Sequence, residues 1–118
     1  MPLPEFKQIV DEAKKEIKEI DQAELKRMKG AKQEFALVDV REKEEQQGGM
    51  IPGAVGVSRG MLEYKIDEVT TDKDKPIVLY CGGGSRSALA AQSLKKMGFK
   101  NVMSLIGGFR GWKESEGK

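Results

Sequence analysis

The segment that most constrains the fold is an apolar run that leads directly into a glycine-rich loop and then into a helical segment. Residues 76–80 read Pro-Ile-Val-Leu-Tyr, a pattern typical of a strand buried on both faces of a parallel sheet. Cys81-Gly82-Gly83-Gly84-Ser85 follows at once, and residues 87–97 then form a helix pattern that ends before Gly98. Ligands of parallel sheets bind beyond the carboxyl ends of the strands, so this loop is a candidate site.

Helical and strand patterns alternate along the rest of the chain. Further strands are predicted at 17–20, 34–40, 54–57 and 101–106, and helices at 4–15, 21–30, 42–47, around 61–66 and after Gly107-Gly108. In the helix over 21–30, Asp21 is the predicted N-cap, Glu24 completes a capping box and Gly30 is the C′ residue. This alternation predicts a single α/β domain with a mostly parallel five-stranded sheet and helices on both faces.

The composition excludes several classes of protein. The 118 residues suit one compact domain, and 21 Lys and Arg against 19 Asp and Glu give a net charge of +2, which argues against a nucleic-acid binder. No apolar run approaches the ~20 residues of a membrane span. The first 20 residues are too charged for a secretory signal. We therefore expect a soluble, cytoplasmic domain that binds neither nucleic acid nor membrane.

The chain has one cysteine and no histidine. A single cysteine excludes an internal disulfide and an all-cysteine metal cage. The absence of histidine excludes Ser-His-Asp and Cys-His catalysis as well as histidine metal ligands. We expect no metal and no cofactor, and any chemistry must proceed without imidazole.

Cys81 is the candidate nucleophile. The commonest fate of a free cysteine is that of a small buried apolar residue. Here, however, the glycine-rich loop directs backbone N–H groups and a helix N-terminus at one point, and Arg86 adds a cation. Such surroundings lower a thiol pKa from its ordinary value of about 8.5. We therefore predict that Cys81 is a thiolate at neutral pH.

Three blocks of sequence carry a resemblance to a known family. They are Asp39-Val40-Arg41 with Glu45 and the run from Gly49 to Ala54, then the loop Cys81–Ser87, and finally Gly107-Gly108-Phe109 with Trp112. In this order they resemble the single-domain rhodaneses, which are sulfurtransferases, over about Ile17–Trp112. The resemblance implies a three-layer rhodanese-like domain over 17–118. Residues 1–16 lie outside it and are predicted to form an N-terminal helical extension, which either packs on the domain or mediates self-association.

The resemblance also implies a mechanism. Cys81 would take a sulfur atom from a small anionic donor such as thiosulfate or a persulfide, and would pass it to cyanide, a thiol or a protein acceptor. The loop residues Gly82, Gly83, Gly84, Ser85 and Arg86 would bind the anion. Four residues separate Cys81 from Arg86, one fewer than in the phosphatase relatives of this fold, so the loop suits one sulfur atom rather than a tetrahedral oxyanion.

The chain departs from the family pattern in places that bear on specificity. Met50 replaces the usual histidine, Gln46 replaces a common aromatic residue, and Gly82 replaces a basic or amide side chain. The loop therefore offers the donor few side chains. Arg59, at the end of a predicted strand, is a candidate for the additional cation, although a surface arginine or an ion-pair partner is an equal alternative. Asp39 and Arg41 are expected to stabilise the fold.

Three functions remain open from the sequence. The first is a sulfurtransferase that turns over thiosulfate through a Cys81 persulfide. The second is a persulfide carrier that serves a protein partner and uses thiosulfate poorly. The third is a non-catalytic rhodanese-like binding module, against which the intact cysteine counts.

Overall fold

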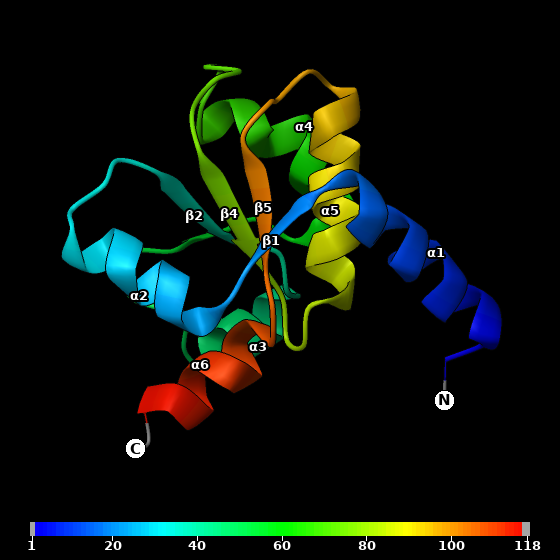
Figure 1. The fold of residues 1–118 in the computed structure, drawn as a ribbon, viewed down its shortest axis with the longest axis horizontal. Coiled ribbons are helices and arrows are strands. Elements are labelled where there is room, and N and C mark those ends of the chain that lie inside the picture. The colour runs from blue at the N-terminus through cyan, green and yellow to red at the C-terminus, as the bar shows by residue number, and fades with distance from the viewer. Residues whose placement is uncertain (1, 117–118) are drawn as a thin grey trace.

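The computed structural model describes residues 2–116 and contains a five-stranded, all-parallel sheet in the order β1-β5-β4-β2-β3 (Figure 1). The strands are β1 (Lys18–Ile20), β2 (Ala36–Asp39), β3 (Val55–Gly56), β4 (Ile77–Tyr80) and β5 (Val102–Leu105). The predicted α/β class and strand number are thus confirmed. The strand with the clearest apolar pattern, β4, is the central one.

Helices cover both faces of the sheet, which confirms the three layers (Figure 1). They are α1 (Pro4–Glu16), α2 (Gln22–Gly30), α3 (Lys43–Gln47), α4 (Leu62–Lys65), α5 (Ser85–Lys96) and α6 (Gly108–Glu116), with 3₁₀ turns at Arg59–Met61 and Ile66–Glu68. α4 and α5 pack on one face, and α2 and α6 pack on the other. None of the helices in residues 2–116 combines the length and apolar character needed to cross a bilayer.

Side chains along β4 alternate between the two faces of the sheet, so this strand contributes to the hydrophobic cluster on each face. Ile77 and Leu79 point towards α4 and α5, whereas Val78 and Tyr80 point towards α2 and α6. All four side chains are fully buried. Cys81 therefore directly follows a strand whose side chains are all buried.

The N-terminal helix α1 packs outside α5, so that it forms an additional layer beside the domain (Figure 1). Val10 and Ala13 of α1 are buried against Ala88 of α5. The division into an extension over 1–16 and a domain over 17–118 stays a prediction, and Met1, Gly117 and Lys118 lie outside the described residues.

One predicted helix end is wrong. Asp21 is the N-cap of α2 as predicted, since its side chain accepts the Glu24 N–H at 2.8 Å. Gly30, however, is the last helical residue rather than the C′ residue, and the left-handed position is Lys32, with φ 55°. The helical geometry continues into Ala31, whose N–H reaches the Arg27 carbonyl, so the turn falls later than the glycine suggests.

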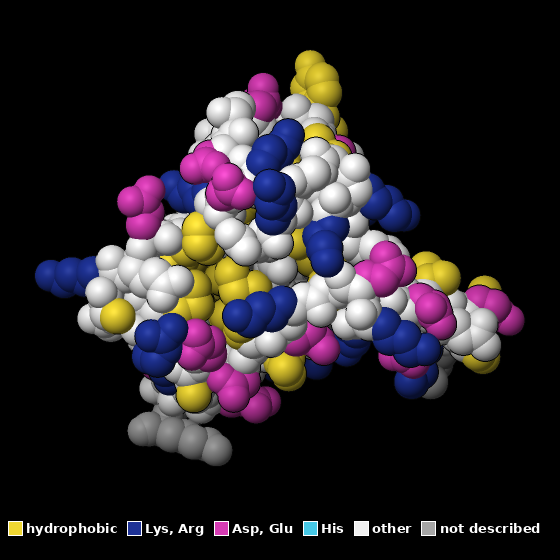
Figure 2. All heavy atoms as spheres, turned by 45° about the horizontal axis from the view of Figure 1, so that its top comes forward, with side chains coloured by type: hydrophobic (Ala, Val, Ile, Leu, Met, Phe, Trp, Pro, Cys, Tyr) yellow, Lys and Arg dark blue, Asp and Glu magenta, His cyan; other side chains and the backbone are white. Residues whose placement is uncertain are grey.

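The surface carries charges of both signs. On the face shown in Figure 2, Lys and Arg side chains are interspersed with Asp and Glu side chains, without a continuous basic stripe. This arrangement matches the net charge of +2.

Candidate active site

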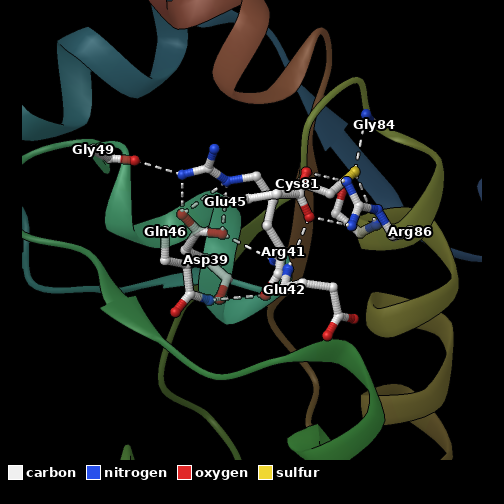
Figure 3. Close-up of polar contacts among 10 residues, drawn as sticks. Asp39, Arg41, Glu42, Glu45, Gln46, Gly49, Cys81, Gly84 and Arg86 are labelled. Carbon is white, nitrogen blue, oxygen red and sulfur yellow. Dashed lines mark hydrogen bonds and ion pairs between the residues drawn. The ribbon is translucent and has the colours of Figure 1, made fainter.

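The thiol of Cys81 lies in a ring of hydrogen-bond donors at the start of α5 (Figure 3). The Gly84 N–H donates to Sγ at 3.0 Å, the Ser87 N–H donates at 3.4 Å, and the Ser87 hydroxyl lies 3.5 Å away. Gly84 is the N-cap of α5 and has a φ of 113°, which glycine adopts without strain. The helix begins at Ser85, two residues earlier than predicted, and the N–H of its third residue, Ser87, reaches the sulfur.

Two opposing effects determine the pKa of Cys81. Burial of the thiol, which is 1% exposed, raises the pKa. Hydrogen bonds from the Ser87 side chain and from the backbone N–H groups of Ser87, Gly84 and Gly83 outweigh it, so the pKa lies below its ordinary value. The shift has the predicted direction, and its main favourable cause is hydrogen bonding to the sulfur.

A buried pair of serines lies behind the sulfur. The hydroxyls of Ser87 on α5 and Ser104 on β5 are 2.8 Å apart, and both residues are fully buried. This contact fixes the Ser87 side chain beside Sγ. The sequence interpretation did not include Ser104, although a serine inside the apolar run of residues 102–106 was a usable signal.

The first turn of α6 holds the other side of the loop. The Phe109 N–H donates to the Cys81 carbonyl at 2.8 Å, and the Arg110 N–H donates to the Gly82 carbonyl at 3.1 Å. A Cβ on Gly108, which has a φ of 54°, would collide with the Cys81 and Gly82 backbone. The glycine is thus required for α6 to approach the loop so closely.

Arg86 is paired with Glu45 of α3 rather than hydrogen-bonded to the sulfur (Figure 3). Its guanidinium donates to the two carboxylate oxygens at 2.8 and 3.1 Å. This contact with Arg86, helped by the Glu42 N–H, lowers the pKa of Glu45 to about 2. The cation at the predicted loop position therefore has a carboxylate partner, which the sequence interpretation did not identify.

Asp39 and Arg41 form a buried network below the loop, in keeping with a structural role. The backbone N–H, Nε and Nη2 of Arg41 all donate to the Asp39 carboxylate, and Nη2 also donates to the Gly49 carbonyl at 2.6 Å. Gln46 adds bonds from Nε2 to the carbonyls of Asp39 and Arg41. These contacts hold the β2–α3 connection, which leads into α3 and so helps to position Glu45.

Arg59 is joined to a different part of the molecule. Its Nη1 donates to Glu63 at 2.8 Å, and the same carboxylate oxygen accepts the Ser93 hydroxyl of α5. Ser93 lies two helical turns beyond Ser87, away from the start of α5. The structure thus does not bring Arg59 together with the loop, and its role in anion binding stays a prediction.

The remaining predicted residues line the loop with little side-chain bulk. Gly82 and Ser85 are half-buried, and Gly83 is exposed. The groups that face the sulfur are the Ser87 side chain and the backbone N–H groups of Gly83, Gly84 and Ser87. Within residues 2–116, no three Asp, Glu or Cys side chains gather as a metal site would require.

The all-parallel sheet, with a hydrogen-bonded cysteine in a loop between a strand and a helix, places the chain among the α/β proteins. Comparison with known proteins gives the family. The family model "Rhodanese-like domain" matches residues 21–115, so the chain belongs to the rhodanese-like family. It is 44% identical over 97 residues to a Bacillus subtilis protein named "Putative sulfurtransferase YtwF", covering 82% of this chain and 91% of the relative. Thiosulfate sulfurtransferase GlpE of Coxiella burnetii is 38% identical over 82 residues, covering 70% and 75%.

A solved structure resembles the chain over almost its whole length. It is a Rhodopseudomonas palustris protein of unknown function, described as a possible tyrosine phosphatase, with a TM-score of 0.88 and 35% identity. The similarity covers 98% of this chain and 96% of that one. The similarity to it thus extends beyond the part of the chain that the family model matches.

Proposed function

We propose that the protein is a sulfurtransferase that carries sulfane sulfur on Cys81. The observation that carries the proposal is the set of N–H groups of Gly84 and Ser87 that converge on Sγ at the start of α5. These donors favour a thiolate and would equally hold the terminal sulfur of a persulfide. The names of the relatives, sulfurtransferase and thiosulfate sulfurtransferase, support the same chemistry.

The reaction would proceed in two displacements on sulfur. The Cys81 thiolate attacks the outer sulfur of thiosulfate, a Cys81–sulfur bond forms, and the sulfur–sulfur bond of thiosulfate breaks as its electron pair leaves with sulfite. Cyanide then attacks the outer sulfur of the persulfide, thiocyanate leaves, and the Cys81 thiolate is restored. No net oxidation or reduction occurs in the protein, and ping-pong kinetics are expected.

Intact mass spectrometry tests the proposal. Incubation with thiosulfate should add one sulfur atom to the protein, and subsequent cyanide should remove it as thiocyanate. The Cys81→Ser variant should show neither change. A wild-type protein that gains no sulfur from either thiosulfate or a small-thiol persulfide would refute the proposal.

A second candidate, the persulfide carrier, is favoured by one observation. The loop rim formed by Gly82 and Gly83 bears no side chains, and Gly83 is exposed. A bulky protein thiol or persulfide could approach such a rim. Slow turnover of thiosulfate together with fast transfer between Cys81 and a protein thiol would identify the carrier.

The phosphatase alternative is disfavoured by loop length. Four residues separate Cys81 from Arg86, and the guanidinium of Arg86 is paired with the Glu45 carboxylate. A phosphatase needs its arginine free to bind the phosphoryl oxygens. We expect no hydrolysis of p-nitrophenyl phosphate by this protein.

A further inference from the structure

The forked end of the Arg110 guanidinium lies against the catalytic loop. A Cβ placed on Gly83 would lie 3.5 Å from Nη1, 3.6 Å from Nη2 and 3.8 Å from Cζ of Arg110. The near-equal distances mean that the two terminal nitrogens face the loop together. Since the Gly83 N–H is one of the groups that lower the Cys81 pKa, the guanidinium adjoins the wall of the sulfur site.

The charge of Arg110 is uncompensated within the described residues. Arg86 is paired with Glu45, Arg41 with Asp39 and Arg59 with Glu63. For Arg110, no carboxylate in residues 2–116 lies within 4.0 Å of the guanidinium. The side chain is exposed, so its charge is available to an incoming anion.

The position of Arg110 in the helix is unfavourable for stability. Arg110 is the third residue of α6, whose first turn carries no acidic residue. A cation in the first turn opposes the helix dipole. At the same time its backbone N–H is bonded to the Gly82 carbonyl, so the side chain begins at a fixed place beside the loop.

The glycines of the loop leave room for this arrangement. Side chains at Gly82 and Gly83 would project towards Arg86 and Arg110, respectively, at 3.3 and 3.5 Å. The sequence suggested that the lack of side chains at Gly82 and Gly83 would weaken recognition of the donor. In the structure, the lack of a side chain at Gly83 leaves space for Arg110 of α6 beside the loop. The guanidinium fork matches the spacing of two oxygens on one anion.

We infer that Arg110 is a specificity-determining residue that binds the oxyanion end of a small anionic sulfur donor while Cys81 attacks its sulfur. This inference rests on the proposed function. The oxyanion would be the sulfonate of thiosulfate or a carboxylate of a small-thiol persulfide, and the two sources are tested separately with thiosulfate and with glutathione persulfide.

The first experiment measures sulfur transfer in Arg110→Ala, Arg110→Lys and the control Lys113→Ala. Lys113 lies on the same helix, one turn further on, so its replacement removes the same charge. We expect kcat/KM for thiosulfate to fall about tenfold in Arg110→Ala, as for loss of one charged hydrogen-bonded contact, and less in Arg110→Lys. The rate at which cyanide removes sulfur from the loaded protein should change less than twofold.

The same variants are then assayed with glutathione persulfide as the donor. A similar fall in kcat/KM with glutathione persulfide would extend the role of Arg110 to carboxylate donors, whereas a fall with thiosulfate alone would restrict it to the sulfonate.

The second experiment does not depend on sulfur transfer. Cys81 is alkylated with the anion iodoacetate and with neutral iodoacetamide, and the ratio of the two rates is compared among the variants. Because both reagents need the thiolate, a change in the Cys81 pKa cancels in this ratio. We expect the ratio to fall at least threefold in Arg110→Ala and to stay at the wild-type value in Lys113→Ala.

The outcomes separate the two proposals. If wild-type protein accepts no sulfur from any donor but Arg110→Ala lowers the alkylation ratio, the function is wrong and the anion site stands. If wild-type protein transfers sulfur, and both the kcat/KM for thiosulfate and the alkylation ratio are unchanged in Arg110→Ala, the role of Arg110 is overturned. Equal losses in Arg110→Ala and Lys113→Ala would also overturn it, since the effect would then reflect overall charge.

Discussion

Cys81 is both one of the most buried residues of the chain and its candidate nucleophile, and the hydrogen bonds around Sγ reconcile these two properties. Burial alone would raise the pKa of the thiol, whereas Ser87, Gly84 and Gly83 lower it. We predict that the rate of alkylation by iodoacetamide rises with pH around a midpoint below the value of about 8.5 of a free cysteine. The pH dependence of the rate measures this directly, and a midpoint at or above that value would contradict the site geometry.

Replacement of Ser87 tests directly how hydrogen bonding to Sγ offsets the effect of burial on the Cys81 pKa. The Ser87→Ala variant loses the hydroxyl that lies 3.5 Å from Sγ and leaves Ser104 without its partner. We expect the Cys81 pKa to rise by about 1, the equivalent of roughly 1.4 kcal/mol. The control Ser93→Ala makes the same replacement on the same helix, where the hydroxyl contacts Glu63. An equal shift in both variants would show that the effect is not local to the sulfur.

The surroundings of a single residue can be predicted from the sequence where its neighbours along the chain provide them, but not where its partners are distant in sequence. Cys81 and the loop follow from the junction of an apolar run with three glycines. The partner of Arg86 is 41 positions away, and Ser104 is 17 positions from Ser87. Such pairs depend on how the sheet orders its strands, which no local pattern encodes. The additional cation was sought at Arg59, whereas the structure places Arg110, which the sequence interpretation did not include, against Gly83 of the loop.

At the scale of elements, β2, β4 and β5 were located correctly because continuous apolar runs mark strands buried on both faces. The edge strands β1 and β3 are less buried, and their positions followed from the alternation of helix and strand patterns. Helix starts were less certain: α5 begins at Ser85, because Gly84 adopts a left-handed conformation that composition alone does not reveal. The start of α6 after β5 also depends on a glycine with a positive φ. This residue, Gly108, also lies against the backbone of Cys81 and Gly82.

Gly108→Ala tests how α6 packs against the loop of Cys81 and Gly82. The added Cβ imposes left-handed strain of about 1–2 kcal/mol and also collides with backbone atoms that cannot move without the loop. We expect a loss of more than about 2 kcal/mol in the free energy of unfolding, together with a slower reaction of Cys81. Chemical denaturation and alkylation rates measure both effects. Gly60→Ala is the matched control, because nothing lies within 4 Å of the position of its Cβ.

The packing of α1 on α5 gives a second prediction at this scale. Val10 is 4% exposed against Ala88, whereas the adjacent Ile9 is 53% exposed. Val10→Ala should lower the free energy of unfolding by about 2 kcal/mol, since it removes buried methyl groups and leaves a cavity. Ile9→Ala should change it by less than about 0.5 kcal/mol. Equal effects in urea denaturation would mean that α1 does not pack on α5 as described.

At the scale of the whole molecule, the candidate site lies where three connections meet at the carboxyl ends of the strands. The loop after β4 carries Cys81, the connection after β2 carries Glu45, and α6 after β5 carries Arg110. α5 supplies Ser87, with Ser104 beneath it on β5. The all-parallel order brings the carboxyl ends of β2, β4 and β5 together, so the geometry of the sulfur site depends on the pairing of these three neighbouring strands.

The ion pair between Glu45 and Arg86 links the stability of the whole fold to pH. The pKa of Glu45 is lowered to about 2 in the folded protein, from 4.5 in the unfolded chain. A depressed carboxyl pKa stabilises the fold above the unfolded value, and this stabilisation is lost as pH falls towards the folded value. Glu45→Gln should therefore be less stable than wild type by a constant amount above about pH 5, and the difference should shrink between pH 4.5 and 2. Thermal unfolding across this range measures it, with Glu44→Gln, an exposed neighbour on the same helix, as the control. A difference that is independent of pH, or one that Glu44→Gln reproduces, would show that this pair does not couple the loop to the fold.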